Sequence, residues 1–464
     1  MMRMLSIPEI IVVSAAAYTL RIVVFQCSLC AIAARSQQPA AIAHKLPVKI
    51  HYGGLNMKAY ERLIRYAKTW TTSDEESGTV PSAQREFDLA HLLVEEMKEM
   101  GIEGARVDDK CYVYGFIPET PGMEDAPVCG FIAHLDTAPD FNGKDVKPMI
   151  HENYDGGKVT LPGGIVLDSE VFPHLRELKG RTLITADGTT LLGADDKAGI
   201  AEIMTAVEQL LQSDKPHGRI AIAFTPDEEI GSGAEDLDLE AFGADFAYTV
   251  DGGAENEIEY ENFNAAAATF KVAGRSVHPG DAKNKMINAG LVACEINRML
   301  PEAETPSQTE GREGFFHLTS ISGNVESAEV SYIIRDHSAG GFEARLEALR
   351  MIEKRLNEKY GAGCVKLDIA QQYRNMLEKI EPCMYLIENV RTVMKNLGME
   401  PCEPPVRGGT DGAQLSFRGL PCPNLGTGGY AFHGPYEHIT VEGMEKVVQV
   451  LLGITEAVAD MQVK

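Results

Sequence analysis

Five short clusters of acidic and histidine residues along the sequence could do chemistry together. They are His134-Leu135-Asp136, Asp195-Asp196, Glu228-Glu229, Asp251 and His433. Carboxylates and imidazoles suit borderline cations such as Zn²⁺, Mn²⁺ or Co²⁺ better than they suit Ca²⁺. Because the clusters contain no thiol, they do not form a structural zinc site of the Cys₄ type. The residue types therefore indicate a carboxylate-rich metal site.

The clusters share an expected place in the fold. Each follows a short apolar stretch that predicts a strand, and the carboxyl ends of strands in an open α/β sheet form its ligand site. Taken singly, the clusters also fit structural roles. Asp195-Asp196 could cap a helix, Glu228-Glu229 could lie in a solvated loop, and His433 could belong to a turn. The metal-site interpretation depends on the joint pattern.

The elements that must position the clusters follow an α/β pattern. Apolar stretches predict strands at 128–133, 219–224 and 246–250, and one apolar stripe predicts a helix at 197–211. Residues 181–192 alternate in polarity and turn at Asp187-Gly188, which is typical of a hairpin. This order predicts an α/β fold with an open mixed sheet and helices on both faces.

A second pattern begins near residue 264. Strands and helices are predicted at 265–272, 288–300, 329–335, 341–360 and 364–371. Their order indicates a ferredoxin-like β-α-β-β-α-β unit of α+β type, inserted into the sheet domain. The predicted domains are therefore a sheet domain in two parts, residues 57–263 and 377–464, and an insertion at residues 264–376.

Residues 1–56 differ in composition from the rest of the chain, with one acidic residue against five basic ones. Their apolar stretches are interrupted by Arg21 and fall short of the ~20 residues of a membrane span. Gly53-Gly54 stands shortly before Met57, and a Gly-Gly codon pair can encode a bacterial ribosome-binding site. We expect translation to start at Met57, with a targeting segment or a genuine extension as the alternatives.

The net charge of the chain argues against some classes of binding partner. The 464 residues include 68 acidic and 43 basic ones, for a net charge of −25, which argues against a nucleic-acid partner and a polybasic membrane surface. Nine cysteines in so long a chain do not form a disulfide scaffold and fit a reducing compartment. We therefore expect a cytoplasmic protein with no nucleic-acid or membrane partner.

Longer motifs around the clusters resemble a known family. They lie at 134–137 (HLDT), 193–199 (GADDKAG), 225–231 (TPDEEIG) and 250–253 (VDGG). These motifs resemble the co-catalytic dizinc exopeptidases, which include carboxypeptidase G and aminoacylase. The stretches 276–280, 332–336 and 407–425 look most like the tripeptide aminopeptidases of that family. The resemblance covers residues 57 to 459 and leaves residues 1–56 outside.

The resemblance implies a ligand role for five residues. Asp195 would bridge two zinc ions, for which Mn²⁺ or Co²⁺ could substitute. His134 and Asp251 would complete the protein ligands of one ion. Glu229 and His433 would complete those of the other. A carboxylate has two oxygens, so one Asp can hold two cations about 3.5–4 Å apart.

Two more residues of the clusters have implied roles. Glu228 would be the general base and acid, because the water activated between two metal ions needs a base that is not itself a ligand. Asp136 would hydrogen-bond the imidazole of His134 and fix its tautomer. Asp195 is chosen over Asp196 because the bridging Asp of the family stands two positions before the Lys.

Residues of the insertion, which the resemblance identifies as a lid and dimerisation domain, would contact the substrate. His278 would polarise the substrate carbonyl across a homodimer, and Arg335 would clamp the terminal carboxylate. The alternatives are a polar turn before Pro279 for His278, and for Arg335 a salt bridge with Asp336 or with a Glu of the insertion.

The expected function is zinc-dependent removal of the N-terminal residue from tripeptides, with small peptides as substrates. The same scaffold also hosts dipeptidases and N-acyl amino-acid hydrolases, which stay as alternatives. An alternative of another class is a non-catalytic metal-binding scaffold. Loss of Glu228 or of a ligand would have signalled the scaffold, and all of these residues are present.

Overall fold

The computed structural model describes residues 56–461. The expectation about residues 1–56 therefore lies outside the described residues, apart from Asn56. Within residues 56–461, none of the helices combines the length and the apolar composition that a membrane span requires.

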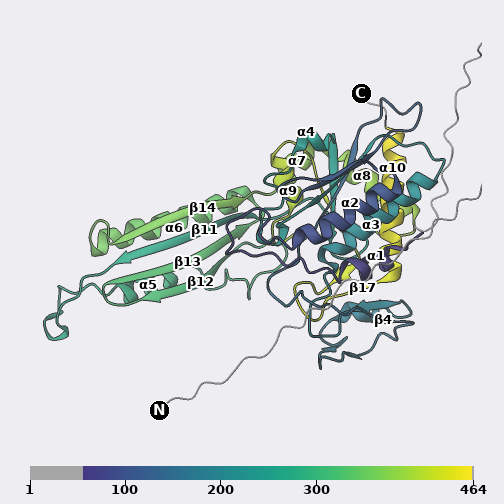
Figure 1. The fold of residues 1–464 in the computed structure, drawn as a ribbon. Helices are drawn as coiled ribbons and strands as arrows, with labels where there is room; N and C mark the ends of the chain where they lie inside the picture. The colour runs from purple at the N-terminus through teal and green to yellow at the C-terminus, as the bar shows by residue number, and fades with distance from the viewer. Residues whose placement is uncertain (1–55, 462–464) are drawn as a thin grey trace, which may run out of the picture. The chain divides into compact units, whose positions relative to one another are not determined.

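A seven-stranded mixed sheet, drawn with its helices in Figure 1, positions three of the predicted clusters, and its strand order is β1-β2-β8-β3-β9-β15-β10. The strands are β1 (Glu103–Val107), β2 (Val113–Ile117), β3 (Cys129–His134), β8 (Ile220–Thr225), β9 (Phe246–Gly252), β10 (Ile258–Glu259) and β15 (Asn424–Gly426). Strands β8, β3, β9 and β15 run parallel, whereas β1, β2 and β10 are antiparallel to their neighbours. The predicted open mixed sheet is confirmed.

Helices cover both faces of this sheet. Successive side chains of a strand point to opposite faces, so neighbouring residues of one strand enter different cores. Phe131 and Ala133 of β3 belong to one apolar core, and Ile132 between them belongs to another. The larger core includes α1 (Ala59–Tyr66), α2 (Glu86–Met100), α3 (Ala194–Gln212), α8 (Tyr385–Asn396) and α10 (Val441–Ala459). The smaller core includes α4 (Leu239–Phe242) and α9 (Asp411–Phe417). The α/β fold predicted from the sequence is confirmed.

A second, antiparallel sheet has the strand order β12-β13-β11-β14. Its elements are β11 (Asn264–Ala273), α5 (Ala289–Arg298), β12 (Phe315–Gly323), β13 (Ser327–Asp336), α6 (Ala339–Tyr360) and β14 (Val365–Tyr373). Both helices share an apolar core with the sheet, which includes Phe270, Val330 and Leu349. The elements occur in the predicted ferredoxin-like order, although β12 was not among the stretches predicted as strands. The domain boundaries and the role as a lid stay predictions.

A small sheet of order β16-β17-β7-β4 brings distant segments together. Its strands are β4 (Met149–His151), β7 (Leu183–Thr185), β16 (Gly429–Tyr430) and β17 (His438–Thr440). Beside it lie the paired strands β5 (Val159–Thr160) and β6 (Val166–Leu167). The short helices are η1 (Pro173–Arg176), η2 (Glu228–Ile230), η3 (Pro279–Asp281), α7 (Leu377–Ile380) and η4 (Glu381–Cys383). Because β17 pairs with β7, the segment before α3 lies near the segment that carries His433.

Two parts of the predicted strand pattern are wrong. Residues 181–192 do not form a hairpin, because β7 pairs with β4 and β17 instead of with the residues after Asp187-Gly188. Asp195 therefore follows no strand and lies at the start of α3, and His433 follows β16 of the small sheet. The other three clusters lie at the carboxyl ends of strands as predicted: His134 is the last residue of β3, Asp251 is the penultimate residue of β9, and Glu228 follows β8.

Candidate metal centre

The five predicted ligands lie together at the carboxyl ends of β3, β8 and β9. Nε2 of His134 is 2.9 Å from Oδ1 of Asp195 and 3.4 Å from Oδ1 of Asp251. Nε2 of His433 is 2.9 Å from Oε2 of Glu229 and 3.3 Å from Oδ2 of Asp195. Asp195 therefore presents one carboxylate oxygen to each histidine and stands between two groups of donors.

The geometry distinguishes Asp195 from its neighbour. Donor atoms of His134, Asp195 and Glu229 lie within 4.8 Å of one another, as do those of His134, Asp196 and Asp251. The side chain of Asp196, however, is buried, and its two oxygens accept the backbone N–H groups of His134 and Gly199, both at 3.1 Å. Asp196 is thus engaged in holding the backbone, whereas both oxygens of Asp195 face the histidines.

The histidines and carboxylates of the cluster shift one another's pKa values. Burial alone would lower the pKa of His134, but the surrounding carboxylates, Asp251 first among them, raise it well above its ordinary value. Hydrogen bonds to Asp195 and Glu229 raise the pKa of His433 to about 11. Burial and the charge of Asp195 raise the pKa of Glu229 to about 8. The carboxylates therefore draw positive charge into the cluster, which a bound cation would also supply.

Glu229 offers a direct test of whether the cluster suits a metal ion. Its side chain is 4% exposed, and its Oε1 has no hydrogen-bond partner within residues 56–461. A buried carboxylate oxygen without a partner is costly unless a ligand satisfies it. Imidazole nitrogen and carboxylate oxygen are also the donors that zinc and similar cations take in catalytic sites. The residues present therefore fit a metal centre.

Asp136 holds the segment that carries Glu228 and Glu229. Its Oδ1 accepts the backbone N–H of Glu228 at 3.0 Å, and its Oδ2 accepts that of Glu229 at 3.2 Å. Nδ1 of His134 lies 3.1 Å from the backbone oxygen of Asp136 and 3.3 Å from its Oδ1. One fully buried carboxylate therefore orients both His134 and the pair of glutamates.

Glu228 is half-buried in η2, directly after β8. Burial and the charge of Asp251 raise its pKa well above the ordinary value. The turn before it has Asp227 at φ 58°, and Oδ2 of Asp227 accepts the backbone N–H of Ser82 at 2.7 Å. Glu86 accepts the backbone N–H of Asp227 at 3.3 Å, so contacts from outside the sheet also hold the turn.

Sequence reasoning missed two buried acids near the cluster. Oδ2 of Asp411 accepts the hydroxyl of Thr225 at 2.8 Å, and burial raises the pKa of Asp411 to about 7. Glu437 accepts three backbone N–H groups at the start of α3. Asp411 lies inside one of the family motifs, whereas the only signal for Glu437 was its place four residues after His433.

The two predicted substrate residues lie outside the cluster. His278 is exposed and caps the start of η3, and its Nδ1 accepts the N–H of Gly280 at 3.2 Å. Arg335 donates to the backbone oxygens of Ala266 and Ile334 and lies 5.2 Å from the ring centre of Tyr373. Among the described residues, neither side chain makes a hydrogen bond or ion pair with the five ligands.

The alternative salt bridge for Arg335 is not formed. Asp336 pairs instead with Arg345, which also binds Glu304 at 2.8 Å. The guanidinium of Arg335 therefore has no carboxylate partner among the described residues and is available to a substrate carboxylate.

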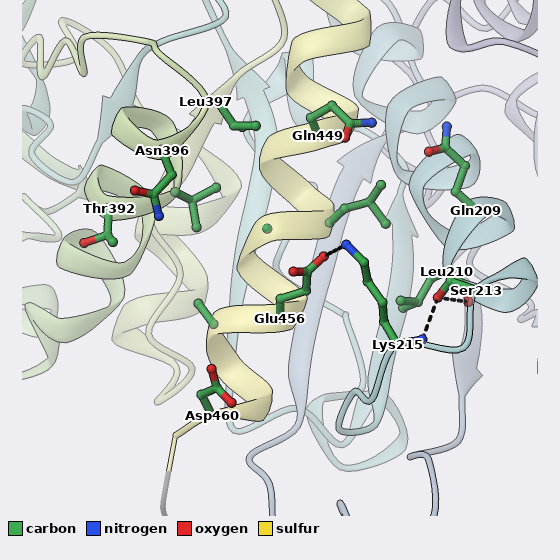
Figure 2. A pocket seen from close by; sticks show the side chains of 14 residues that line it. Gln209, Leu210, Ser213, Lys215, Thr392, Asn396, Leu397, Gln449, Glu456 and Asp460 are labelled. Carbon is green, nitrogen blue, oxygen red and sulfur yellow. Dashed lines mark hydrogen bonds and ion pairs between the residues drawn. The ribbon is translucent and has the colours of Figure 1, made fainter.

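A surface groove of about 660 Å³ lies away from this cluster (Figure 2). It is lined by the end of α3, by α8 and by α10, and an ion pair between Lys215 and Glu456 spans it. None of the predicted site residues lines the groove. The candidate functional site is therefore the cluster of histidines and carboxylates.

Known proteins are similar to this chain in both sequence and fold. Residues 185–457 match the family described as Peptidase family M20/M25/M40. A protein named Peptidase T from Alkaliphilus oremlandii is 52% identical over 400 residues, which cover 85% of this chain and 98% of that relative. The structure of aminopeptidase PepT from Bacillus cereus matches with a TM-score of 0.69 at 21% identity, covering 87% of this chain and 98% of that one. A Bacillus subtilis protein described as a dinuclear metal binding peptidase matches with a TM-score of 0.59 at 15% identity, covering 86% and 96%.

Proposed function

Because the chain belongs to peptidase family M20/M25/M40 and is a peptidase, we propose that it removes the N-terminal residue from tripeptides with the help of two zinc ions. The observation that carries this proposal is the position of Asp195, with one carboxylate oxygen toward His134 and the other toward His433. Such an arrangement suits a carboxylate that bridges two cations. The names Peptidase T and aminopeptidase PepT of its relatives support the substrate class.

In this proposal Asp195 would be shared by the two ions. His134 and Asp251 would hold the first ion, and Glu229 and His433 would hold the second. When bound, a pair of zinc ions polarises the scissile carbonyl and lowers the pKa of a water molecule. The unpartnered Oε1 of Glu229 supports its role as a ligand, because an ion would satisfy that oxygen.

Glu228 serves as the general base and then as the general acid. It takes a proton from the attacking water and gives it to the nitrogen of the leaving amine. Its neighbour Glu229 faces His433, so the two adjacent glutamates have separate tasks. Asp136 keeps these tasks apart by holding both backbone N–H groups in fixed positions.

Recognition of the far end of the substrate falls to Arg335. Its guanidinium can bind a carboxylate with two parallel hydrogen bonds. Asp336 does not compete for this guanidinium, because Asp336 pairs with Arg345. A clamp on the terminal carboxylate, away from the scissile bond, would limit the length of the substrate. His278 would stabilise the developing negative charge on the carbonyl oxygen from the partner of a homodimer, and the homodimer and the cytoplasmic location stay predictions.

A panel of substrates tests the function. Protein that starts at Met57 is loaded with zinc and incubated with a dipeptide, a tripeptide, a tetrapeptide, an N-acetylated tripeptide and an N-acetyl amino acid. We expect release of the N-terminal residue from the free tripeptide alone. Cleavage of the dipeptide or the acylated substrates would replace the proposal with a dipeptidase or an N-acyl amino-acid hydrolase. No cleavage with two zinc ions bound would favour the non-catalytic scaffold.

Two neighbouring substitutions test the division of roles. Glu228→Gln should lower the turnover rate by a factor on the order of 10²–10⁴. The variant should retain both zinc ions. Glu229→Gln should lose zinc as well as turnover, because it removes a ligand. If Glu228→Gln also loses zinc, then Glu228 is a ligand and the assignment of the pair is wrong.

A further inference from the structure

Glu437 connects the two chain segments that carry Asp195 and His433. Its Oε2 accepts the backbone N–H groups of Leu192 at 2.7 Å and Gly193 at 2.8 Å, and its Oε1 accepts that of Asp195 at 3.0 Å. The side chain is 1% exposed. Both oxygens of one buried carboxylate are therefore used on a segment more than 200 residues earlier in the chain.

The segment before α3 needs this carboxylate, because neither a sheet nor a helix satisfies its N–H groups. Residues 188–193 form no strand, and Gly193 has a φ of 75°. Asp195 has φ −82° and ψ 106°, so it is not helical although α3 begins at Ala194. The first N–H groups of a helix lack partners within it, and a negative charge is favoured there. Glu437 fills both needs and so fixes the backbone of Asp195.

The other end of Glu437 is anchored in the small sheet. The next residue, His438, begins β17 and pairs with Thr185 of β7. His433 lies four residues before Glu437 in the same segment, and its Nε2 faces Oδ2 of Asp195. The hydrogen bond from Asp195 to Glu437 therefore closes a loop of contacts that fixes His433 and Asp195 relative to each other.

We propose that Glu437 is a positioning residue that holds Asp195 between the two metal ions by fixing its backbone. The proposal deepens the proposed metal centre and rests on it. Both carboxylate oxygens of Glu437 are taken by backbone N–H groups, so it acts through Asp195 and the segment of His433. Its loss should weaken metal binding without altering the set of ligands.

Glutamine is an informative replacement at this position. The amide oxygen of Glu437→Gln can still accept the N–H groups of Leu192 and Gly193. The amide NH₂ would then face the N–H of Asp195, so that two donors oppose each other. The substitution therefore removes the bond to Asp195 and leaves the other two.

A matched control lies five residues further along the chain. Glu442, in the first turn of α10, accepts the backbone N–H of Thr182 at 2.8 and 3.1 Å. Glu442→Gln makes the same chemical change to a carboxylate that binds backbone N–H, and Glu442 contacts none of the five ligands. Any general effect of such a change on the fold should appear in both variants.

The measurement is zinc affinity by competition with a chromophoric chelator, together with the visible spectrum of the Co²⁺-loaded protein. Changes in the residues behind metal ligands typically cost about 10–100-fold in affinity. We expect Glu437→Gln to lose that much for at least one ion, with an altered Co²⁺ spectrum. Glu442→Gln should match wild type in both measurements.

Each outcome decides between the two proposals. If wild type binds two ions and Glu437→Gln binds them with the same affinity and spectrum, the role of Glu437 is refuted while the metal centre stands. If wild type binds no metal, the proposed function fails and this inference fails with it. If Glu437→Gln does not fold, Glu437→Asp replaces it, because the shorter carboxylate cannot reach both Gly193 and Asp195. Unchanged metal affinity in that variant would equally refute the proposal.

Discussion

Replacing Asp136 by Asn should slow the enzyme through the backbone of Glu228 and Glu229. The carboxylate of Asp136 accepts the N–H groups of Glu228 and Glu229 with separate oxygens. The amide of Asn can accept one of them and presents NH₂ to the other. A hydrogen bond to a charged group contributes about 1.5–3 kcal/mol, and 1.36 kcal/mol corresponds to a tenfold rate change. We therefore expect kcat/KM to fall about 10- to 150-fold.

The assay is the initial rate of tripeptide cleavage by zinc-saturated protein, with zinc content measured in parallel. Asp245→Asn is a suitable control, because Asp245 accepts the backbone N–H of Val128 at 2.7 Å, next to the opposite end of β3. The control should retain full activity. If Asp136→Asn stays within threefold of wild type with both ions bound, then the backbone of Glu228 and Glu229 does not need this carboxylate.

Two further predictions concern stability. Arg62 is fully buried and binds Glu96 and Glu208, each at 2.8 Å, so Arg62→Met should cost about 3–5 kcal/mol in urea unfolding by leaving buried carboxylates without their cation. An unchanged midpoint would contradict this. Burial lowers the pKa of His438 to about 4, against 6.5 ordinarily, so its contribution to stability is complete above pH 6.5 and is lost as the pH falls toward 4. Between pH 7 and pH 5 the stability advantage of wild type over His438→Asn should shrink by about 2 kcal/mol, and a constant advantage would refute the assignment.

Much of the fold follows from local patterns in the sequence. Strands β3, β8 and β9 are short apolar stretches whose residues are almost all buried, so their positions are visible without any knowledge of their neighbours. Three of the ligand clusters lie at the carboxyl ends of these strands, and their convergence is a consequence of parallel pairing. In the second sheet β12 was missed, because most of its residues are exposed and it does not stand out as an apolar stretch.

The remainder depends on contacts between distant residues. The hairpin predicted at Asp187-Gly188 fails because β7 finds partners in β4 and in β17, which lies near the end of the chain. The local polarity pattern is the same in either pairing, so it could not reveal the difference. The backbone of Asp195 likewise depends on Glu437, an acid that no local motif distinguishes from the many surface acids of this chain.

These contacts also explain why the site holds more carboxylates than two metal ions require. The backbone N–H of His134 is held by Asp196, that of Glu229 by Asp136, and that of Asp195 by Glu437. The N–H of Asp251 is held in the same way by the amide oxygen of Asn424 at 3.1 Å. Four of the five proposed ligands are thus fixed through their own backbone by a buried side chain that is not a proposed ligand. Asp136 and Glu437 nevertheless act on one network, because Asp136 also orients His134, whose Nε2 lies 2.9 Å from Oδ1 of Asp195. The loss of kcat/KM in a double variant should therefore depart from the product of the two single losses, since residues in one hydrogen-bond network are not additive in free energy. A double variant that shows the simple product would contradict this coupling.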